Sequence, residues 1–425
     1  MNITPYPKNL ETAVNWDYKF WNTQPVTKVN ESVILEKEFT LQEEKIEKIE
    51  KLQDTPVKNE QGLLVSAPAA CSLSLSEKNE QLQETLPENF AWVNYDLSKE
   101  SDKEKISVFL NKFYGMDVNG EFSRQYNANY LEWLISDKQY IALGVEHKGT
   151  LMGFIYGHIT KTQVNRRQLD LVECSLLCIH PKLRYKGLTP KLITELKRQF
   201  TVLGYKYGTF STVNYLSKPF CSVAAHNRII SAKILLETGF VKLDETITLD
   251  AVKKTSKLPD EPTVDGFKKM EESHVDQAFD LFNQYMKKYN FHPIFSKDQF
   301  KTEFYNNKFI TTYIIENKKG EVLDLVSYYT LPSLVLNKNE KYKTIKRGYL
   351  YYYTCVNTTP YKLLQNILII GKKFGVDVFT ALDNMENMYV LKELGFDESP
   401  TTYHEYMFNL KIPALQNFQV AKVFL

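Results

Sequence analysis

A short basic turn between an apolar run and a helical pattern holds the residues best suited to bind a phosphate. The stretch 178–192 reads CIHPKLRYKGLTPKL, with Arg184, Gly187 and Thr189 between the two patterns. A pyrophosphate site needs backbone N–H groups aimed at its oxygens, a small residue for close approach, and a helix N-terminus. We expect Thr189 to cap this helix and Pro190 to lie in its first turn. The turn is therefore a candidate phosphate site, although such a turn taken alone is more often structural.

Size and composition favour a soluble protein of two domains. The chain has 425 residues, 43% of them hydrophobic and 24% charged, with a net charge of +2. This charge gives no reason to expect nucleic acid, and no spacing resembles a zinc site. The start, MNITPYPKNL, lacks a signal peptide's apolar segment, and no apolar run is long enough to span a membrane. We expect a cytoplasmic protein, and buried free thiols at Cys174 and Cys178, which strand alternation would place on one face.

The first 86 residues differ in character from the rest. An aromatic segment at 18–28, YKFWNTQPVTK, precedes the charged run LQEEKIEKIEKLQ at 41–53. The charged run favours a solvated helix or a linker. On the residues alone, the aromatic segment is best interpreted as fastening this arm to the core.

From Leu86 onward the chain repeats one order of patterns. Each half is expected to contain, in order, a hairpin, a long β-rich run, an amphipathic helix, a strand and a short helix ending in Gly-Phe. In the first half these elements are expected at 140–157, 171–180, 189–200, 207–213 and 230–240. In the second half they are expected at 309–330, 349–357, 359–374, 376–382 and 388–396. Gly239 and Gly395 are expected to end the two short helices. The repetition predicts two duplicated α/β domains.

The basic turn fits neither a dinucleotide-binding nor a P-loop glycine pattern. What remains, R-x-x-G-x-T after a strand, resembles motif A of the GNAT-type acyltransferases, which holds the pyrophosphate of coenzyme A. The second half has CVNTTPYKLL at the equivalent place, without a glycine or a basic pair. We therefore expect one coenzyme site, in the first half.

Longer motifs narrow the resemblance to the glycylpeptide N-tetradecanoyltransferases, or N-myristoyltransferases. The motifs are YKFWNTQPV at 18–26, LPENFAW at 86–92, ECSLLCIH at 173–180, YTLPS at 329–333 and FTALDNMEN at 379–387. The resemblance implies an α/β (α+β) fold of two tandem GNAT-like domains related by pseudo-symmetry, with a saddle-shaped sheet. We expect an arm at 1–86 carrying an insert at 36–84, a first domain at 87–255 that binds acyl-CoA, and a second at 256–425 that binds peptide.

The same resemblance implies the residues that hold the donor, myristoyl-CoA, with no permanently bound cofactor and no metal. They are Tyr18, Lys19, Phe20 and Trp21 in the arm, then Leu176, Leu177, Cys178 and Ile179, and finally Arg184, Tyr185, Lys186, Gly187, Leu188 and Thr189. Gly187 stands where the family usually has a second arginine, so one positive charge is missing.

The implied chemistry is attack of an N-terminal glycine amine on a thioester. The backbone N–H groups of Leu176 and Leu177 would form the oxyanion hole. The α-carboxylate of Leu425 would be the general base. An α-carboxyl group has a pKa of about 3.5, and burial would make it a better base. Without the resemblance, the end of the chain, VAKVFL, would be interpreted as a packed last strand.

On the peptide side, the resemblance implies contacts from Asp117, Phe122, Tyr126, Ser211, Asn227, Ser333 and Tyr353. The family's acidic loop, which receives a basic peptide side chain, is reduced here to Asp117 and Glu121. We therefore expect altered peptide preference. The expected partners are N-terminal glycine peptides or nascent proteins, with no stable membrane insertion, and the expected state is a monomer.

Two alternatives remain open on the sequence. Gly187 mildly favours a short-chain N-acetyltransferase, and the altered segments at 117–126 and 399–402 are compatible with a homologue that binds acyl-CoA or acylated peptides without turnover. His180 and His226 are weaker candidates for a base, because each has a simpler structural use.

Overall fold

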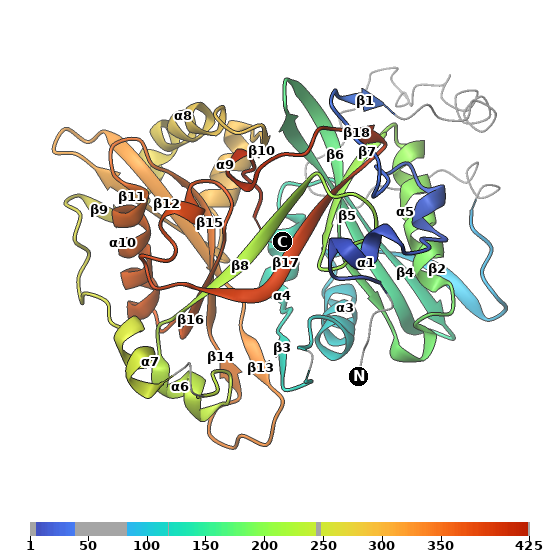
Figure 1. The fold of residues 1–425 in the computed structure, drawn as a ribbon, viewed down its shortest axis with the longest axis horizontal. Coiled ribbons are helices and arrows are strands. Elements are labelled where there is room, and N and C mark those ends of the chain that lie inside the picture. The colour runs from blue at the N-terminus through green and yellow to red at the C-terminus, as the bar shows by residue number, and fades with distance from the viewer. Residues whose placement is uncertain (1–5, 39–82, 118, 244–247, 424–425) are drawn as a thin grey trace.

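The computed structural model describes residues 6–38, 83–117, 119–243 and 248–423 (Figure 1). The predicted charged run at 41–53, most of the insert at 36–84, and Leu425 lie outside these ranges. No helix of the described ranges is long and apolar enough to cross a membrane.

The chain forms a mixed α/β fold, as predicted. The strands of the first half are β1 (Lys37–Glu38), β2 (Phe90–Tyr95), β3 (Phe122–Arg124), β4 (Tyr140–His147), β5 (Thr150–Val164), β6 (Arg167–Ile179), β7 (Tyr207–Thr212) and β8 (Cys221–Ile229). Those of the second half are β9 (Phe267–Lys269), β10 (Phe291–Pro293), β11 (Ile310–Glu316), β12 (Val322–Thr330), β13 (Ser333–Val335), β14 (Thr344–Ile345), β15 (Arg347–Thr354), β16 (Val378–Leu382), β17 (Asp397–Phe408) and β18 (Leu410–Lys411). The α-helices are α1 (Leu10–Val14), α3 (Glu100–Phe113), α4 (Ala128–Ile135), α5 (Leu188–Val202), α6 (Ala232–Glu237), α7 (Leu249–Thr255), α8 (Val275–Met286), α9 (Lys297–Phe304) and α10 (Pro360–Lys373).

In the described part of the chain, one sheet of thirteen strands runs through both halves. Its order is β2-β4-β5-β6-β7-β17-β8-β16-β15-β12-β11-β9, with β10 paired to β5. In the first half, β4, β5 and β6 are antiparallel, and β7 follows α5 and runs parallel to β6. In the second half, β11, β12 and β15 are antiparallel, and β16 follows α10 and runs parallel to β15. The predicted duplication is therefore present in the topology.

The two halves exchange strands at the centre of the sheet. β17, from the end of the chain, lies between β7 and β8 of the first half and pairs antiparallel with both (Figure 1). β8 in turn pairs with β16 of the second half. Since each half covers the strand edge of the other, neither central edge is left unpaired.

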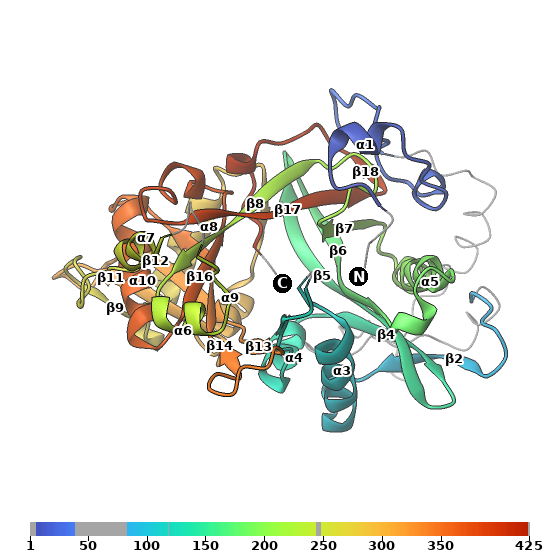
Figure 2. The same cartoon turned by 60° about the horizontal axis from the view of Figure 1, so that its bottom comes forward.

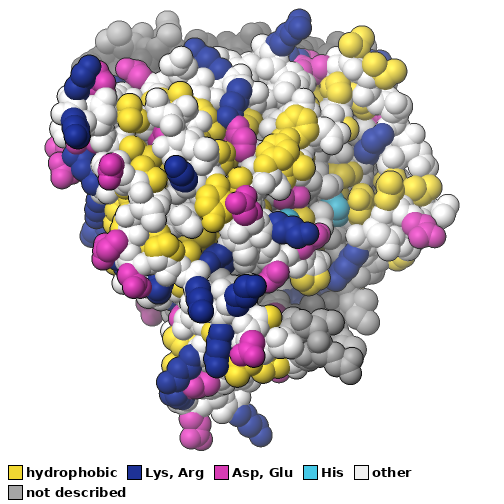
Figure 3. Space-filling view, turned by 60° about the vertical axis from the view of Figure 1, so that its left-hand side comes forward, with side chains coloured by type: hydrophobic (Ala, Val, Ile, Leu, Met, Phe, Trp, Pro, Cys, Tyr) yellow, Lys and Arg dark blue, Asp and Glu magenta, His cyan; other side chains and the backbone are white. Residues whose placement is uncertain are grey.

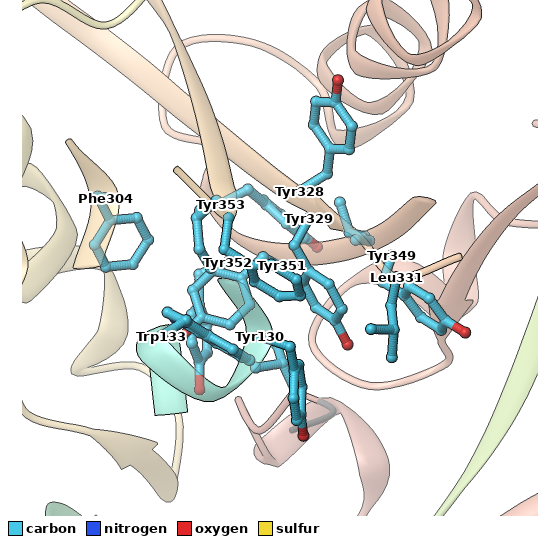
Figure 4. Packing of buried hydrophobic residues seen from close by; sticks show 14 of the residues in the cluster. Tyr130, Trp133, Phe304, Tyr328, Tyr329, Leu331, Tyr349, Tyr351, Tyr352 and Tyr353 are labelled. Carbon is cyan, nitrogen blue, oxygen red and sulfur yellow. The ribbon is translucent and has the colours of Figure 1, made fainter. Parts of the chain in front are cut away.

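Helices cover the first half of the sheet on both faces (Figure 2). α5 packs through Leu188, Leu192, Leu196 and Phe200 on one face. Gly157 permits this approach, because a Cβ there would lie 2.7 Å from the Phe200 ring. α3 and α4 pack on the other face, within a large cluster rich in tyrosine that continues into the second half (Figure 4).

Two expectations about local structure are wrong. The N-cap of α5 is Gly187, with a φ of 81°, so Thr189 lies inside the helix and does not cap it, although Pro190 does fall in the first turn. A short α-helix is expected at 388–396, but the structure has a 3-10 helix at Asn387–Tyr389 followed by turns. Gly395 nevertheless has the left-handed φ, 73°, that its predicted place after a helical segment requires.

Candidate active site

A cavity of about 1650 Å³ is lined by residues from both halves of the sheet. Small-molecule pockets usually measure roughly 300–1,000 Å³, so this one has room for a larger ligand or for two ligands. Its apolar wall includes Ile155, Val172, Ile193, Leu196 and Phe200, which come from β5, β6 and α5. Its more polar wall is built from the segment around β3 and from strands β8, β13, β15, β16 and β17.

A β-bulge at Leu176 and Leu177 interrupts β6 where this strand lines the cavity. Cys178 pairs with Phe154 and Ser175 with Tyr156, so two residues of β6 face only Ile155 of β5. Leu176 has a φ of 54°, a left-handed conformation that costs a non-glycine residue about 1–3 kcal/mol. Bulges of this kind redirect backbone and side chains next to active sites. Both residues line the cavity, as the oxyanion-hole prediction requires.

The bulge also corrects the prediction for the two cysteines of β6. Cys174 packs against the cluster under α5, whereas Cys178 belongs to the cluster on the other face of the sheet. Because the extra residue reverses the alternation of β6, the two thiols lie on opposite faces. Cys178 and Ile179 are buried and do not line the cavity, unlike their neighbours at the bulge.

Tyr114 and Arg124 also line the cavity and were not among the predicted site residues. Burial raises the pKa of Tyr114 to about 12, while the charge of Arg124 and a hydrogen bond from the Leu176 backbone oppose the rise. Arg124 lies in the altered segment 117–126, but nothing in the sequence places its side chain near that of Tyr114, so only the folded arrangement identifies the two.

The aromatic arm packs against the first half, and one of its rings reaches the cavity. Trp21 stacks on Phe210 of β7, with ring centroids 5.1 Å apart and planes inclined by 22°. Tyr18 is buried, and burial raises its pKa to about 12, whereas Lys19 is exposed. Of the four predicted arm residues, Trp21 lines the cavity. The arrangement agrees with a fastening role and places one ring where a ligand would lie.

The basic turn at 184–189 lies at the exposed N-terminus of α5. Among the residues that the structure describes, no side chain caps this helix, and Tyr185 and Gly187 both have positive φ. Arg184 donates to the carbonyl oxygens of Ile179 and Phe113, at 3.1 and 3.0 Å, and so holds the turn against the end of α3. Uncapped N–H groups at a helix N-terminus favour an anion. The turn itself lies outside the cavity lining, with Tyr185, Lys186 and Gly187 exposed, Leu188 buried and Thr189 half-buried.

A buried charged cluster supports Ser211, one of the predicted peptide-side residues. The Ser211 hydroxyl lies 2.6 Å from both carboxylate oxygens of Glu405, and Lys422 Nζ lies 3.1 Å from the same hydroxyl. Lys422 also pairs with Glu405 at 2.6 Å and with Glu173 at 3.3 Å. Burial opposes the Lys422 charge, but the two carboxylates hold its pKa above the usual value. Lys422 is three residues from the end of the chain, so this cluster anchors the C-terminal segment.

The other predicted peptide-side residues are partly brought together. Asp117, Phe122, Tyr126, Ser211, Asn227 and Ser333 all line the cavity. Asp117 is engaged by its own turn, since its carboxylate accepts from the N–H of Phe122 at 2.7 Å and of Asn119 at 3.3 Å. Tyr353 is not brought to the cavity. It is fully buried in the tyrosine cluster with Tyr351 and Tyr352 (Figure 4), where its hydroxyl donates to Glu386.

The described residues form no group of three metal-ligating side chains. On the face of the molecule seen in Figure 3, acidic and basic side chains are interspersed, which agrees with the small net charge.

Comparison with known proteins relates this arrangement to a defined class. Residues 73–223 match the N-terminal domain of myristoyl-CoA:protein N-myristoyltransferase, and residues 237–423 match its C-terminal domain. A glycylpeptide N-tetradecanoyltransferase from Plasmodium falciparum is 29% identical over 98% of this chain and 96% of its own length. A homologue from Kluyveromyces lactis is 30% identical over 93% of this chain and 86% of its own length.

A solved structure agrees with these sequence matches. The crystal structure of Saccharomyces cerevisiae N-myristoyltransferase with bound myristoyl-CoA superposes with a TM-score of 0.81 at 26% identity, over 96% of this chain and 99% of that one. The two-part α/β fold is thus that of an acyltransferase. More narrowly, the chain belongs to the myristoyl-CoA:protein N-myristoyltransferase family.

Proposed function

We propose that this protein transfers a tetradecanoyl group from myristoyl-CoA to the N-terminal glycine amine of peptides and proteins. The observation that carries the proposal is the large cavity, in which the apolar wall under α5, the strained bulge at Leu176 and Leu177, and a polar wall built from both halves meet. The acyl chain would lie along the apolar wall and the peptide along the polar one. The thioester would then lie at the bulge between them.

In this reaction the amine nitrogen bonds to the thioester carbonyl carbon, and the C–S bond breaks to release the thiol of coenzyme A. Negative charge develops on the carbonyl oxygen in between. The backbone N–H groups of Leu176 and Leu177 would stabilise that oxygen, because donors already in place need no rearrangement during the reaction. The cost of holding Leu176 in a left-handed conformation supports this role, since such strain persists mainly where function requires it.

The amine must lose a proton before it attacks. We infer that the α-carboxylate of Leu425 accepts it. The preceding segment is firmly held, which supports the inference: the Ala421 N–H donates to the Phe291 carbonyl at 2.8 Å, and Asn384 donates to the Lys422 carbonyl. A base needs a fixed position more than an unusual pKa.

Incubation with tetradecanoyl-CoA and an eight-residue peptide with N-terminal glycine, followed by mass spectrometry, tests the proposal. We expect a peptide that is heavier by one tetradecanoyl group, and no product from the same peptide with its N-terminal amine blocked. Offering acetyl-CoA in parallel tests the short-chain alternative. Tight binding of tetradecanoyl-CoA without product would contradict the proposal and identify a protein that binds donor without turnover.

A further inference from the structure

Two arginine side chains reach the polar wall of the cavity from different strands. Arg124 ends β3 and Arg347 begins β15, and both line the cavity. The guanidinium carbon of Arg124 lies 6.0 Å, and that of Arg347 5.5 Å, from the centroid of one ring, that of Tyr349. Two positive charges therefore converge on one region of the wall.

The hydrogen-bond partners of these two guanidinium groups are neutral. Arg124 Nη2 donates to the Tyr403 hydroxyl at 3.1 Å, and Arg347 Nη2 donates to the Thr380 hydroxyl at 3.3 Å. The Nε of Arg347 is buried and has no hydrogen-bond partner among the described residues. Within the described part of the chain, Arg167 and Arg198 form ion pairs with carboxylates, whereas Arg124 and Arg347 form none.

The acidic side chains of the cavity do not balance these charges. The Asp117 carboxylate is engaged by the N–H groups of its own turn, and Glu121 pairs with Lys242 at 3.4 Å. Asp397 and Glu398 line the cavity at exposed positions and form no ion pair with either arginine. Partly buried guanidinium groups without a counter-ion are costly, and a carboxylate fits their planar donor pattern.

We propose that Arg124 and Arg347 form a subsite for an acidic side chain of the peptide substrate, within the first few residues after the N-terminal glycine. This inference rests on the proposed function, because it takes the peptide substrate to be the ligand that lies along the polar wall. It reverses the charge preference that the sequence resemblance implies for the family, in which an acidic loop receives a basic side chain.

A peptide panel tests the subsite. Otherwise neutral eight-residue peptides with N-terminal glycine carry Glu, Gln or Lys at one of positions 3 to 7, and each is assayed with tetradecanoyl-CoA. We expect Glu to exceed Gln in kcat/KM by about 10- to 100-fold at one or two positions, the range of a charge-assisted hydrogen bond. Lys should be the poorest there, and the Glu advantage should shrink as salt is raised.

Variants of Arg347 test whether the preference for Glu over Gln arises from the polar wall of the cavity. In Arg347→Gln the ratio of Glu to Gln should fall toward one, and in Arg347→Glu the Lys peptide should become the best of the three. Arg166→Gln, an exposed arginine outside the cavity, is the matched control and should keep the wild-type ratio. Turnover of the wholly neutral peptide reports whether each variant is folded and active.

Each outcome decides one question. Equal kcat/KM for the Glu, Gln and Lys peptides, with normal turnover of the neutral peptide, would overturn the subsite and leave the proposed function standing. So would loss of donor affinity in Arg347→Gln with an unchanged Glu to Gln ratio, because the arginine would then serve a phosphate of the donor. If no peptide is acylated, the proposed function fails. The subsite can still be tested by binding. Fluorescence anisotropy compares the affinities of labelled Glu and Gln peptides for enzyme that is saturated with a non-transferable thioether analogue of the donor. Equal affinities would overturn the subsite.

Discussion

Lys422 Nζ lies 2.6 Å from Oε2 of Glu405, and both side chains are less than a tenth exposed. The pair joins the C-terminal segment to β17, the strand that the second half inserts into the first. It also lies directly beneath Ser211 in the cavity wall. This contact thereby ties the segment around Lys422, the central strand β17 and the cavity wall together.

Replacement of Lys422 by methionine should destabilise the protein strongly. It leaves the buried carboxylate of Glu405 and the half-buried one of Glu173 without their cation, and breaking a buried pair typically costs about 3–5 kcal/mol. Urea unfolding should show this loss, and the double variant Lys422→Met with Glu405→Gln should recover part of it. Lys297→Met, at the exposed pair with Asp276, is the control and should change stability by less than about 1 kcal/mol. An equal loss of unfolding free energy in Lys422→Met and Lys297→Met would contradict the argument that the buried pair stabilises the fold.

Extension of the chain beyond Leu425 should abolish turnover while the fold remains intact. An added glycine moves the α-carboxylate away from the place where it would accept the proton, but it disturbs none of the described contacts of Val420–Val423. Turnover of a glycine peptide is the measurement, with the thermal midpoint and donor binding as controls for folding. Full activity of the extended enzyme would refute the role of Leu425.

Removal of the Trp21 ring should weaken donor binding. Trp21 is buried, stacks on Phe210 and lines the cavity, so Trp21→Ala loosens the arm and opens the apolar wall. We expect the KM for tetradecanoyl-CoA to rise at least about tenfold, since the lost contact of a large apolar ring costs at least about 1.4 kcal/mol of binding free energy. Trp16→Ala, at a 38% exposed position of the same arm, is the matched control. Equal effects of the two changes would show that Trp21 does not serve the donor.

Gly187→Arg separates the charge of the basic turn from its backbone geometry. A side chain at φ 81° costs about 1–2 kcal/mol, and the space around the position is open. Gly187→Ala carries the same strain without the charge. Both variants should lose similar stability. Gly187→Arg should bind the donor more tightly than Gly187→Ala, and this advantage should be larger at low salt than at high salt. Equal donor affinity of the two variants would mean that the phosphates lie elsewhere.

Stability should fall as the pH is lowered from about 7 to about 4. Burial lowers the pKa of His404 to about 4, while Glu405 opposes this, so the folded protein keeps the imidazole neutral. In the unfolded chain the pKa is about 6.5. The unfolded state therefore binds the extra proton in this window, and the stability present above pH 6.5 is progressively lost.

This histidine alone should cost about 2 kcal/mol at pH 5 and about 3 kcal/mol below pH 4. Urea unfolding at pH 7.5 and 5.0 is the measurement. His404→Gln should reduce the difference between the two values, although it also alters the hydrogen bond to Ser222. An unchanged difference would show that other groups govern the acid sensitivity.

The sequence predicted those elements whose signals are local. The hairpin around Lys148 and Gly149, the amphipathic helices at α5 and α10, and the left-handed glycines at 239 and 395 each follow from a period or from a turn residue. The motifs of the arm and of β6 likewise led to the family.

The remaining features depend on pairing between distant segments. The bulge in β6 could not be predicted, because Leu176 and Leu177 carry no sequence mark of a left-handed backbone, and it reversed the expected facing of Cys178. The insertion of β17 between β7 and β8 has no local signal either, since alternation shows which face is buried but not which strand is the neighbour. The convergence of Arg124 and Arg347 follows only from this assembly.

The exchange of strands also governs how the protein is made. β7 and β8 leave the ribosome early, but the strand that joins them, β17, ends at Phe408. At roughly 5–20 residues per second, synthesis from Ile229 to Phe408 takes on the order of 10–40 s. For that time the nascent first half has two unsatisfied edges at its centre, each able to pair with another chain. Expression of either half alone would make this exposure permanent, so the chain can reach its native state only as one folding unit.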